Sequence, residues 1–405
     1  MGDATTDASC REDKKMINLK LSYSKIASSL FIIMMATDFA FGESVKLYKI
    51  PKYLMLMFFT VMVLRLVFSK RTIAKTTVLF APILFTFIEY VSYFWALYPS
   101  VAFEQFKTQF QLLILFLLVF YFFRSEDHLD DYLKAIYYAG FIMAGYAIFA
   151  YGLSGIVLRM LSGVRVGSLI GNENSFGMVF SRATLVAFGY YLSKRRPWYL
   201  IVMAVMIFFA FSSGSRKAIL IILVGVLGIV VFYFGFKRVW KLFLCLCLIA
   251  VAVYFVMSLP FMSSAAQRLV DSLNGKQDAS AFERNSLIRI GWEAIKERPF
   301  LGYGIANFGT YFPKTGYSHN NFIEILFSVG MVGFAVYYTM HVQAGVRIAK
   351  LVMHGADWRY VVLFILLGIN ILFAWWMVQF YTRESWVFLA VILATTERAL
   401  HKRGE

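Results

Sequence analysis

About twelve apolar stretches, each close to the length needed to cross a bilayer, follow one another along this chain. A helix needs about 20 mostly apolar residues to span the hydrocarbon core. Within lipid the backbone amides must be paired inside the segment, which favours helices. The sequence therefore predicts an all-α polytopic membrane protein. The predicted spans are residues 25–41, 52–69, 77–96, 107–123, 133–152, 172–193, 198–213, 218–236, 240–258, 319–342, 358–380 and 385–400.

Composition supports this fold class and limits the partners. Hydrophobic residues make up 60% of the 405 residues, and the mean hydropathy is +0.68. The formal net charge of +17 would suggest a nucleic-acid partner in a soluble protein. Basic residues in a membrane protein instead fix orientation, and some meet anionic lipid headgroups or diphosphates. We therefore expect membrane lipids, and no nucleic acid, among the partners.

The basic residues also predict a topology. Clusters of Lys and Arg occur in 69–75, 194–196, 236–241 and 401–403, and further lysines precede the first span. Because such clusters stay in the cytoplasm, we expect an even number of spans with both termini cytoplasmic. The predicted organisation is a cytoplasmic tail (1–24), nine spans (25–258), an outer loop (259–316), three spans (317–400) and a second cytoplasmic tail (401–405).

The connection before the tenth predicted span is much longer than the other outer connections. Apolar residues recur every three or four positions in 263–273 and 286–300, which is typical of helices. Pro299 should end the second helix, and 274–280 should form a flexible turn. We therefore expect a large, partly helical outer loop.

The stretch "SSGSRKAIL", residues 212–220, places Arg216 at the outer end of a span. An Arg side chain offers a planar fork of donors that suits phosphate. Ser213, Ser215 and the first amides of the following helix could complete an anion site. The alternative is an interfacial anchor that reaches water. Lys217 is interpreted as a plain interfacial charge.

Two further outer segments carry arginines. Arg289 and Trp292 are three residues apart, so they share a helix face and can stack. We expect that face to lie against the membrane domain and Arg284 to be solvated. In the earlier outer loop, Arg165, Asn172 and Asn174 either line a polar opening or belong to ordinary loop structure.

His319 opens an apolar helix within the sequence "GYSHNNFIEILFSVGMVG", residues 316–333. A lone His is more often structural, but Ser318, Asn320 and Glu324 lie next to it or one turn on. Histidine can accept a proton near neutral pH. No second His or Cys lies near it, and the three cysteines suggest neither a disulfide nor a metal site, so no metal is expected.

Residues 289–334 resemble the signature region of the O-antigen ligase and polymerase family. The shared pattern is an Arg before Trp, Pro-x-x-Gly-x-Gly, Asn-Phe, and His-Asn opening a helix that passes through Gly-x-x-Gly. The "SGSRKA" sequence at 213–218 resembles the Ser-Arg that this family carries at the outer end of a central span. With the layout of spans, the resemblance extends over most of the chain.

The resemblance implies a GT-C-like fold and an inverting glycosyltransferase without metal or cofactor. Its place would be the bacterial inner membrane, with the active site facing the periplasm or exterior. Its donor would be an undecaprenyl-diphosphate-linked oligosaccharide. It implies catalytic roles for Arg216, Arg289 and His319. Arg284 is the alternative to Arg289, which precedes Trp by three positions where many members have four. Substrate-binding roles are expected for Arg284, Arg165, Ser215, Asn320, Glu324, Asn172 and Trp292.

Three functions stay open. Polymerases transfer the glycan to the next lipid-linked repeat unit, and ligases transfer it to lipid A-core. The 318–334 sequence is similar to polysaccharide polymerases, so we favour a polymerase, with a chain-length regulator as a further partner. A transporter of lipid-linked glycans would instead carry charged residues deep within spans. Glu89 and Arg65 are the main intramembrane candidates.

Overall fold

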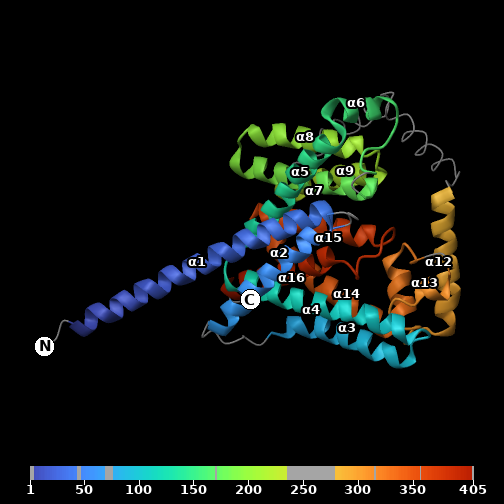
Figure 1. Ribbon diagram of the computed structural model, residues 1–405, viewed down its shortest axis with the longest axis horizontal. Coiled ribbons are helices and arrows are strands. Elements are labelled where there is room, and N and C mark those ends of the chain that lie inside the picture. Colours follow the sequence, from blue (N-terminus) through green and yellow to red (C-terminus); the bar gives the residue numbers. More distant parts are fainter. Residues whose placement is uncertain are drawn as a thin grey trace.

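A computed structural model describes residues 4–42, 47–68, 76–168, 171–234, 279–313, 316–355 and 357–403, with the side chains of the first helix described from Tyr23 onward. These residues form helices joined by short connections (Figure 1). The helices are α1 (Ala4–Phe41), α2 (Lys49–Phe68), η1 (Thr77–Leu79), α3 (Phe80–Val91), η2 (Ser92–Trp95), α4 (Pro99–Ser125), α5 (Leu129–Tyr151), α6 (Leu153–Leu161), α7 (Glu173–Lys194), α8 (Trp198–Ser212), α9 (Arg216–Phe234), α12 (Ala279–Glu297), α13 (Phe308–Tyr311), α14 (Asn321–Met353), α15 (Trp358–Phe373) and α16 (Arg383–Arg403).

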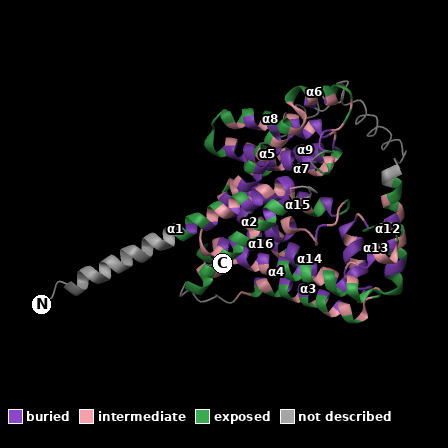
Figure 2. Ribbon diagram, viewed as in Figure 1, coloured by how far each residue is buried: buried purple, intermediate pink, exposed green. Residues whose placement is uncertain are grey.

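The helices form two groups (Figure 1). In one, α7 packs against α5, α8 and α9; in the other, α16 packs against α4 and α14, and α14 packs against α3. Helix α1 packs on α5 and on α2, and α15 packs on α7, α9 and α14, so these two helices join the groups. Buried positions concentrate where the helices meet (Figure 2). The core is rich in phenylalanine, as in the Phe31 and Phe123 pair, whose ring centroids are 4.9 Å apart.

The predicted fold class is confirmed. Within the described residues, seven helices are long and apolar enough to cross a membrane, and α8 and α15 are shorter apolar helices. The predicted spans fall on helices, except for 240–258, which lies outside the described residues. Helix α1 begins at Ala4, so it also includes most of the predicted tail. This arrangement is that of a polytopic membrane protein.

The predicted outer loop is described only in part. Its first predicted helix, 263–273, lies outside the described residues. The second is confirmed as α12, which ends at Glu297, two residues before Pro299. Helix α12 packs on α14, so this part of the loop lies against the helix that His319 precedes.

One predicted span is too long. The run 358–380 ends as helix α15 at Phe373, and the chain then turns before α16 begins. The reason lies at the start of α14, where Asn321 donates its backbone N–H to Ala374 O at 2.7 Å. The side-chain oxygen of Asn321 accepts the N–H groups of Gln379 and Phe380 at 2.8 and 3.1 Å. Asn321 thus pairs backbone N–H groups of residues 379 and 380 that would otherwise need carbonyl partners within a helix, so the chain can leave the helix here. We call residues 374–382 the turn segment.

Helix α14 is broken at Gly330, which has φ 65° and ψ −168°. The loop that follows α12 enters the break. Tyr303 donates its backbone N–H to Phe327 O at 2.8 Å, and Met331 donates to Pro299 O at 2.8 Å. The loop thus pairs backbone groups that the broken helix leaves open, as buried backbone requires.

Two glycines of the family pattern make this insertion possible. A Cβ on Gly302 would lie 2.5 Å from Phe327 O, and one on Gly330 would lie 2.2 Å from the Phe300 backbone. Both residues also have positive φ, which only glycine adopts without strain. Gly302 of Pro-x-x-Gly-x-Gly and Gly330 of Gly-x-x-Gly therefore both allow the outer loop to pack against the break in α14.

Candidate functional site

The starts of α9 and α14 meet the turn segment at one end of the helix bundle. Lys217, in the first turn of α9, donates to Trp376 O at 3.2 Å. Asn320, the N-cap of α14, donates from its side chain to Trp375 O at 3.3 Å. His319 therefore lies next to a point where three segments far apart in the sequence converge. We call His319, Lys217 and Arg284 the His319 cluster.

The backbone at His319 has φ 57°, a left-handed conformation that few residues other than glycine adopt. Bonds on both sides hold it there. Ser318 donates its hydroxyl to Asn320 O at 2.8 Å and its N–H to Glu324 Oε2 at 2.7 Å. The Tyr317 ring lies 4.2 Å from the imidazole, centroid to centroid. Such strain costs about 1–3 kcal/mol and is found most often at functional sites.

The imidazole is half-buried between charged side chains. Burial lowers the pKa of His319, Arg284 lowers it further, and Lys217 acts in the same direction, while Glu283 opposes them. The ring is therefore neutral near pH 7 and able to accept a proton. Two cations beside a neutral imidazole can stabilise an anionic leaving group while the ring takes a proton.

The predicted orientation of α12 is wrong. Trp292 is 49% exposed and Arg289 is exposed, whereas Leu287 is buried. The buried side of α12 is formed by Leu287, Gly291, Ala294 and Ile295. A Cβ on Gly291 would lie 2.6 Å from the Ile323 side chain, so α12 approaches α14 closely on this side.

Arg284 is three residues before Leu287 and seven before Gly291, so it shares the face that packs on α14. It, rather than Arg289, acts on His319. The family's alternative arginine is thus the one that the fold brings to the His319 cluster.

A second group of predicted residues lies at the start of α9. Arg165 donates to Ser213 O at 2.8 Å and to Asn174 Oδ1 at 3.0 Å. Ser215 donates its hydroxyl to the same Asn174 oxygen at 3.0 Å. Arg165, Asn174 and Ser215 together fix the connection from which Arg216, which is exposed, begins α9. The predicted Arg165 and Ser215 are therefore brought together.

The other predicted polar residues are engaged by the backbone. Asn172 caps α7 by accepting the Asn174 N–H at 2.8 Å. Asn320 caps α14 by accepting the N–H groups of Phe322 and Ile323 at 2.9 and 3.0 Å. Glu324 is 1% exposed, and its carboxylate accepts the Ser318 N–H, so it fixes the backbone next to His319. The geometry gives these side chains a positioning role.

Sequence reasoning missed Lys217, Trp375 and Trp376. Trp375 and Trp376 are 54% and 42% exposed. Both tryptophans fall within the predicted span 358–380, so the sequence did not indicate that they lie near the site. Lys217 was interpreted as a plain interfacial charge. It follows Arg216 directly in the first turn of α9, so the two side chains point in different directions and can reach different neighbours.

Two ion pairs that join predicted spans to the start of α16 were also missed. Asp38 of α1 lies 2.7 Å from Arg383, and Arg182 of α7 pairs with Glu384. The two charged residues expected within the membrane were Arg65 and Glu89. Arg65 forms an ion pair with Glu126 at 2.7 Å, near the opposite end of the bundle. Glu89 is buried and accepts a hydrogen bond from the Gln109 side chain. A lone Asp or Arg in an apolar run does not reveal a partner more than 200 residues away.

Within the described ranges, no group of three or more His, Cys, Asp and Glu side chains is close enough to hold a metal ion. The candidate ligands of an anion are Lys217, Arg284 and Arg216 with the first amides of α9.

Comparison with protein families agrees with the resemblance. Residues 201–338 match the family model described as O-antigen ligase, which supports the resemblance to the O-antigen polymerase and ligase family over that part of the chain. The matched region contains the His319 cluster and excludes Arg165 and Asn172. The chain matches no curated protein at a significant level.

Proposed function

We propose that this integral membrane protein, which carries an O-antigen ligase family domain over residues 201–338, polymerises undecaprenyl-diphosphate-linked repeat units. The reaction would take place on the outer face of the bacterial inner membrane. The family supports a glycosyltransferase-type enzyme that uses lipid-linked glycans. The observation that carries the finer proposal is the His319 cluster, a half-buried neutral imidazole beside two cations.

The chemistry follows from these groups. A hydroxyl of the acceptor sugar attacks the anomeric carbon of the donor glycan while the bond from that carbon to the diphosphate breaks. His319 accepts the hydroxyl proton, and the bonding electrons leave with the diphosphate. Arg284 and Lys217, with Arg216 at the start of α9, stabilise the charge that develops on the leaving oxygen. Direct displacement inverts the anomeric configuration.

The first test is a reconstituted reaction. The purified protein is given a lipid-linked repeat unit alone, with and without EDTA, and product size is read on a gel. A ladder of lengthening chains in both conditions supports a metal-independent polymerase. Transfer only after lipid A-core is added would make the protein a ligase.

His319→Ala tests the assignment of the base. We expect turnover to fall by about a hundred- to ten-thousand-fold, the usual contribution of a general base, with donor binding retained. Asn320, and not His319, caps the start of α14, so His319→Ala leaves this cap in place. If the variant polymerised at the parent rate, His319 would have no part in proton transfer.

A transporter of lipid-linked glycans is the alternative, and Asp38 and Arg182 favour it because each is a charged residue within a predicted span, as is typical of transport paths. Inactivity with both acceptors, together with movement of the labelled lipid across proteoliposome membranes, would replace the enzyme proposal.

A further inference from the structure

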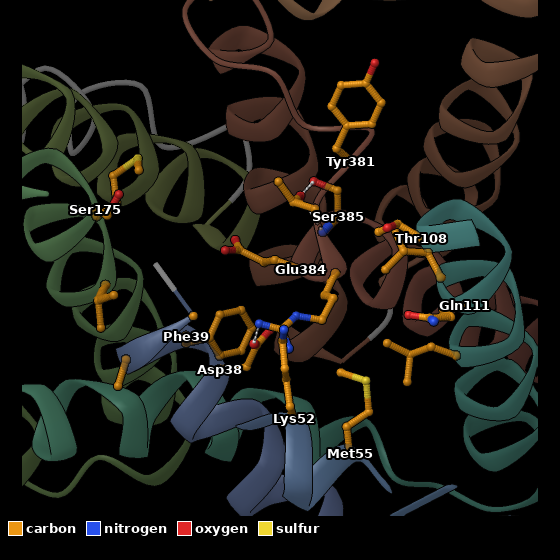
Figure 3. Close-up of a pocket in the computed structure, with 18 of the residues that line it drawn as sticks. Asp38, Phe39, Lys52, Met55, Thr108, Gln111, Ser175, Tyr381, Glu384 and Ser385 are labelled. Carbon is orange, nitrogen blue, oxygen red and sulfur yellow. Dashed lines mark hydrogen bonds and ion pairs between the residues drawn. The ribbon is translucent and has the colours of Figure 1, made fainter. Parts of the chain in front are cut away.

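A cavity of about 720 Å³ lies between α1, α2, α4, α7 and α16 (Figure 3). Its volume is within the range of small-molecule sites, about 300–1,000 Å³. Tyr381 lines the cavity and accepts the Ala306 N–H at 3.1 Å, and Asn370 and Met377 line it from the same stretch of chain. The turn segment therefore forms part of the wall of this cavity and also contacts the His319 cluster.

The polar lining of the cavity is made of paired charges. Arg383 lies 2.7 Å from Asp38, and Arg182 pairs with Glu384. Asp38 and Glu384, one from each pair, both line the cavity (Figure 3). The two arginines and the two carboxylates have no net charge together. Their N–H groups and carboxylate oxygens still offer hydrogen-bond donors and acceptors side by side. Asp38 is buried within the candidate span Tyr23–Phe41, where a charged group is costly, so an ion pair that it forms at the wall of a cavity is evidence for a functional site.

The remaining lining combines hydroxyl and amide groups with aromatic rings. Thr108 and Gln111 of α4 are exposed and line one side, while Phe39 and Phe59 contribute rings. Sugars present hydroxyl groups that both donate and accept, together with C–H faces that pack on rings. An uncharged saccharide matches this lining. A diphosphate matches it less well, because each arginine already has a carboxylate partner and Lys52 is the single further cation among the lining residues.

We propose that this cavity binds the uncharged saccharide part of a lipid-linked substrate. The proposal rests on the proposed function and adds to it a glycan site separate from the leaving-group site. The two ion pairs would bind the sugar hydroxyl groups, and the turn segment would couple the saccharide to the His319 cluster.

The test fills the cavity without touching the ion pairs. Thr108→Trp places a large side chain in the cavity. Thr60→Trp is the matched control, because Thr60 is also an exposed threonine within a span and does not line the cavity. The probe is the lipid-free oligosaccharide released from the repeat unit by mild acid, and binding is measured on the full chain in nanodiscs. Gln111→Trp is the second variant if Thr108→Trp is not folded.

We expect Thr108→Trp to weaken oligosaccharide binding by at least about ten-fold, and Thr60→Trp to bind as the parent does. His319→Ala should retain binding while losing turnover. The proposal is overturned if the parent does not bind the oligosaccharide, if the cavity variants bind it normally, or if they lose binding of undecaprenyl diphosphate instead. A parent that polymerises but fails these binding tests removes the cavity proposal alone. A parent that binds in the cavity but forms no product removes the enzyme proposal alone.

Discussion

At the scale of single residues, the chemistry of the candidate site depends on the environment of one imidazole. His319 is held with positive φ by Ser318 and Glu324, and its pKa is lowered by burial and by Arg284. Strain in the backbone and a shifted pKa are each found most often at functional positions.

Charge changes around His319 should move its pH profile in opposite directions. Arg284→Gln removes a cation that lowers the pKa of His319, so the acid limb of kcat/KM should move to higher pH. Glu283→Gln removes an anion that raises this pKa, so the limb should move to lower pH. The measurement is kcat/KM as a function of pH in the reconstituted reaction.

Arg289→Gln is the matched control, because Arg289 lies on the same helix but on its exposed face. Its profile should match that of the parent. An equal shift in Arg289→Gln and Arg284→Gln would contradict the assignment of the α12 faces.

At the scale of elements, the break in α14 connects the outer loop to the membrane helices. The loop after α12 pairs with the open backbone groups of α14, and it also contacts η2 and the residue that precedes α4. Trp95 donates its ring N–H to Leu301 O at 3.0 Å, and Tyr98 donates its N–H to Asn307 Oδ1 at 2.6 Å. The Asn-Phe pair of the family pattern is therefore also structural.

Two alanine substitutions in α14 should have opposite effects. Gly330→Ala forces a side chain into positive φ, which costs about 1–3 kcal/mol, and places its Cβ 2.2 Å from Phe300. Gly345 has no atom within 4 Å of a built Cβ, so Gly345→Ala should be neutral or stabilising by up to about 1 kcal/mol. Thermal unfolding in detergent checks both. A Gly330→Ala protein with the parent Tm would show that the break does not require glycine.

At the scale of the whole molecule, the His319 cluster and the cavity proposed to bind saccharide both adjoin the turn segment, at one end of the bundle. The opposite end is held by ion pairs such as Arg65–Glu126 and Arg124–Glu397, at 2.7 and 3.1 Å. The proposed topology places the first end outside the cell membrane and the second in the cytoplasm.

Cysteine labelling tests this orientation. In a chain with its three cysteines replaced by serine, Ser162→Cys near the His319 end should react with a membrane-impermeant maleimide in intact spheroplasts. His354→Cys, at the opposite end and also exposed, should react only after the membrane is opened. The reverse pattern would place the candidate site in the cytoplasm and exclude the proposed reaction there.

The sequence alone determined the membrane-helical fold, most helix positions, the family pattern and the choice of His319 as a candidate residue, because apolar length and local spacing are properties of neighbouring residues. It did not determine which face of α12 packs, because Leu287 on one face and Trp292 on the other are both apolar, and the close contact with α14 decided between them. It also could not reveal Lys217 beside His319, the turn within the run 358–380, or the ion pairs Asp38–Arg383 and Arg182–Glu384. Those depend on contacts between segments far apart in the chain, and only the tertiary structure brings such segments together.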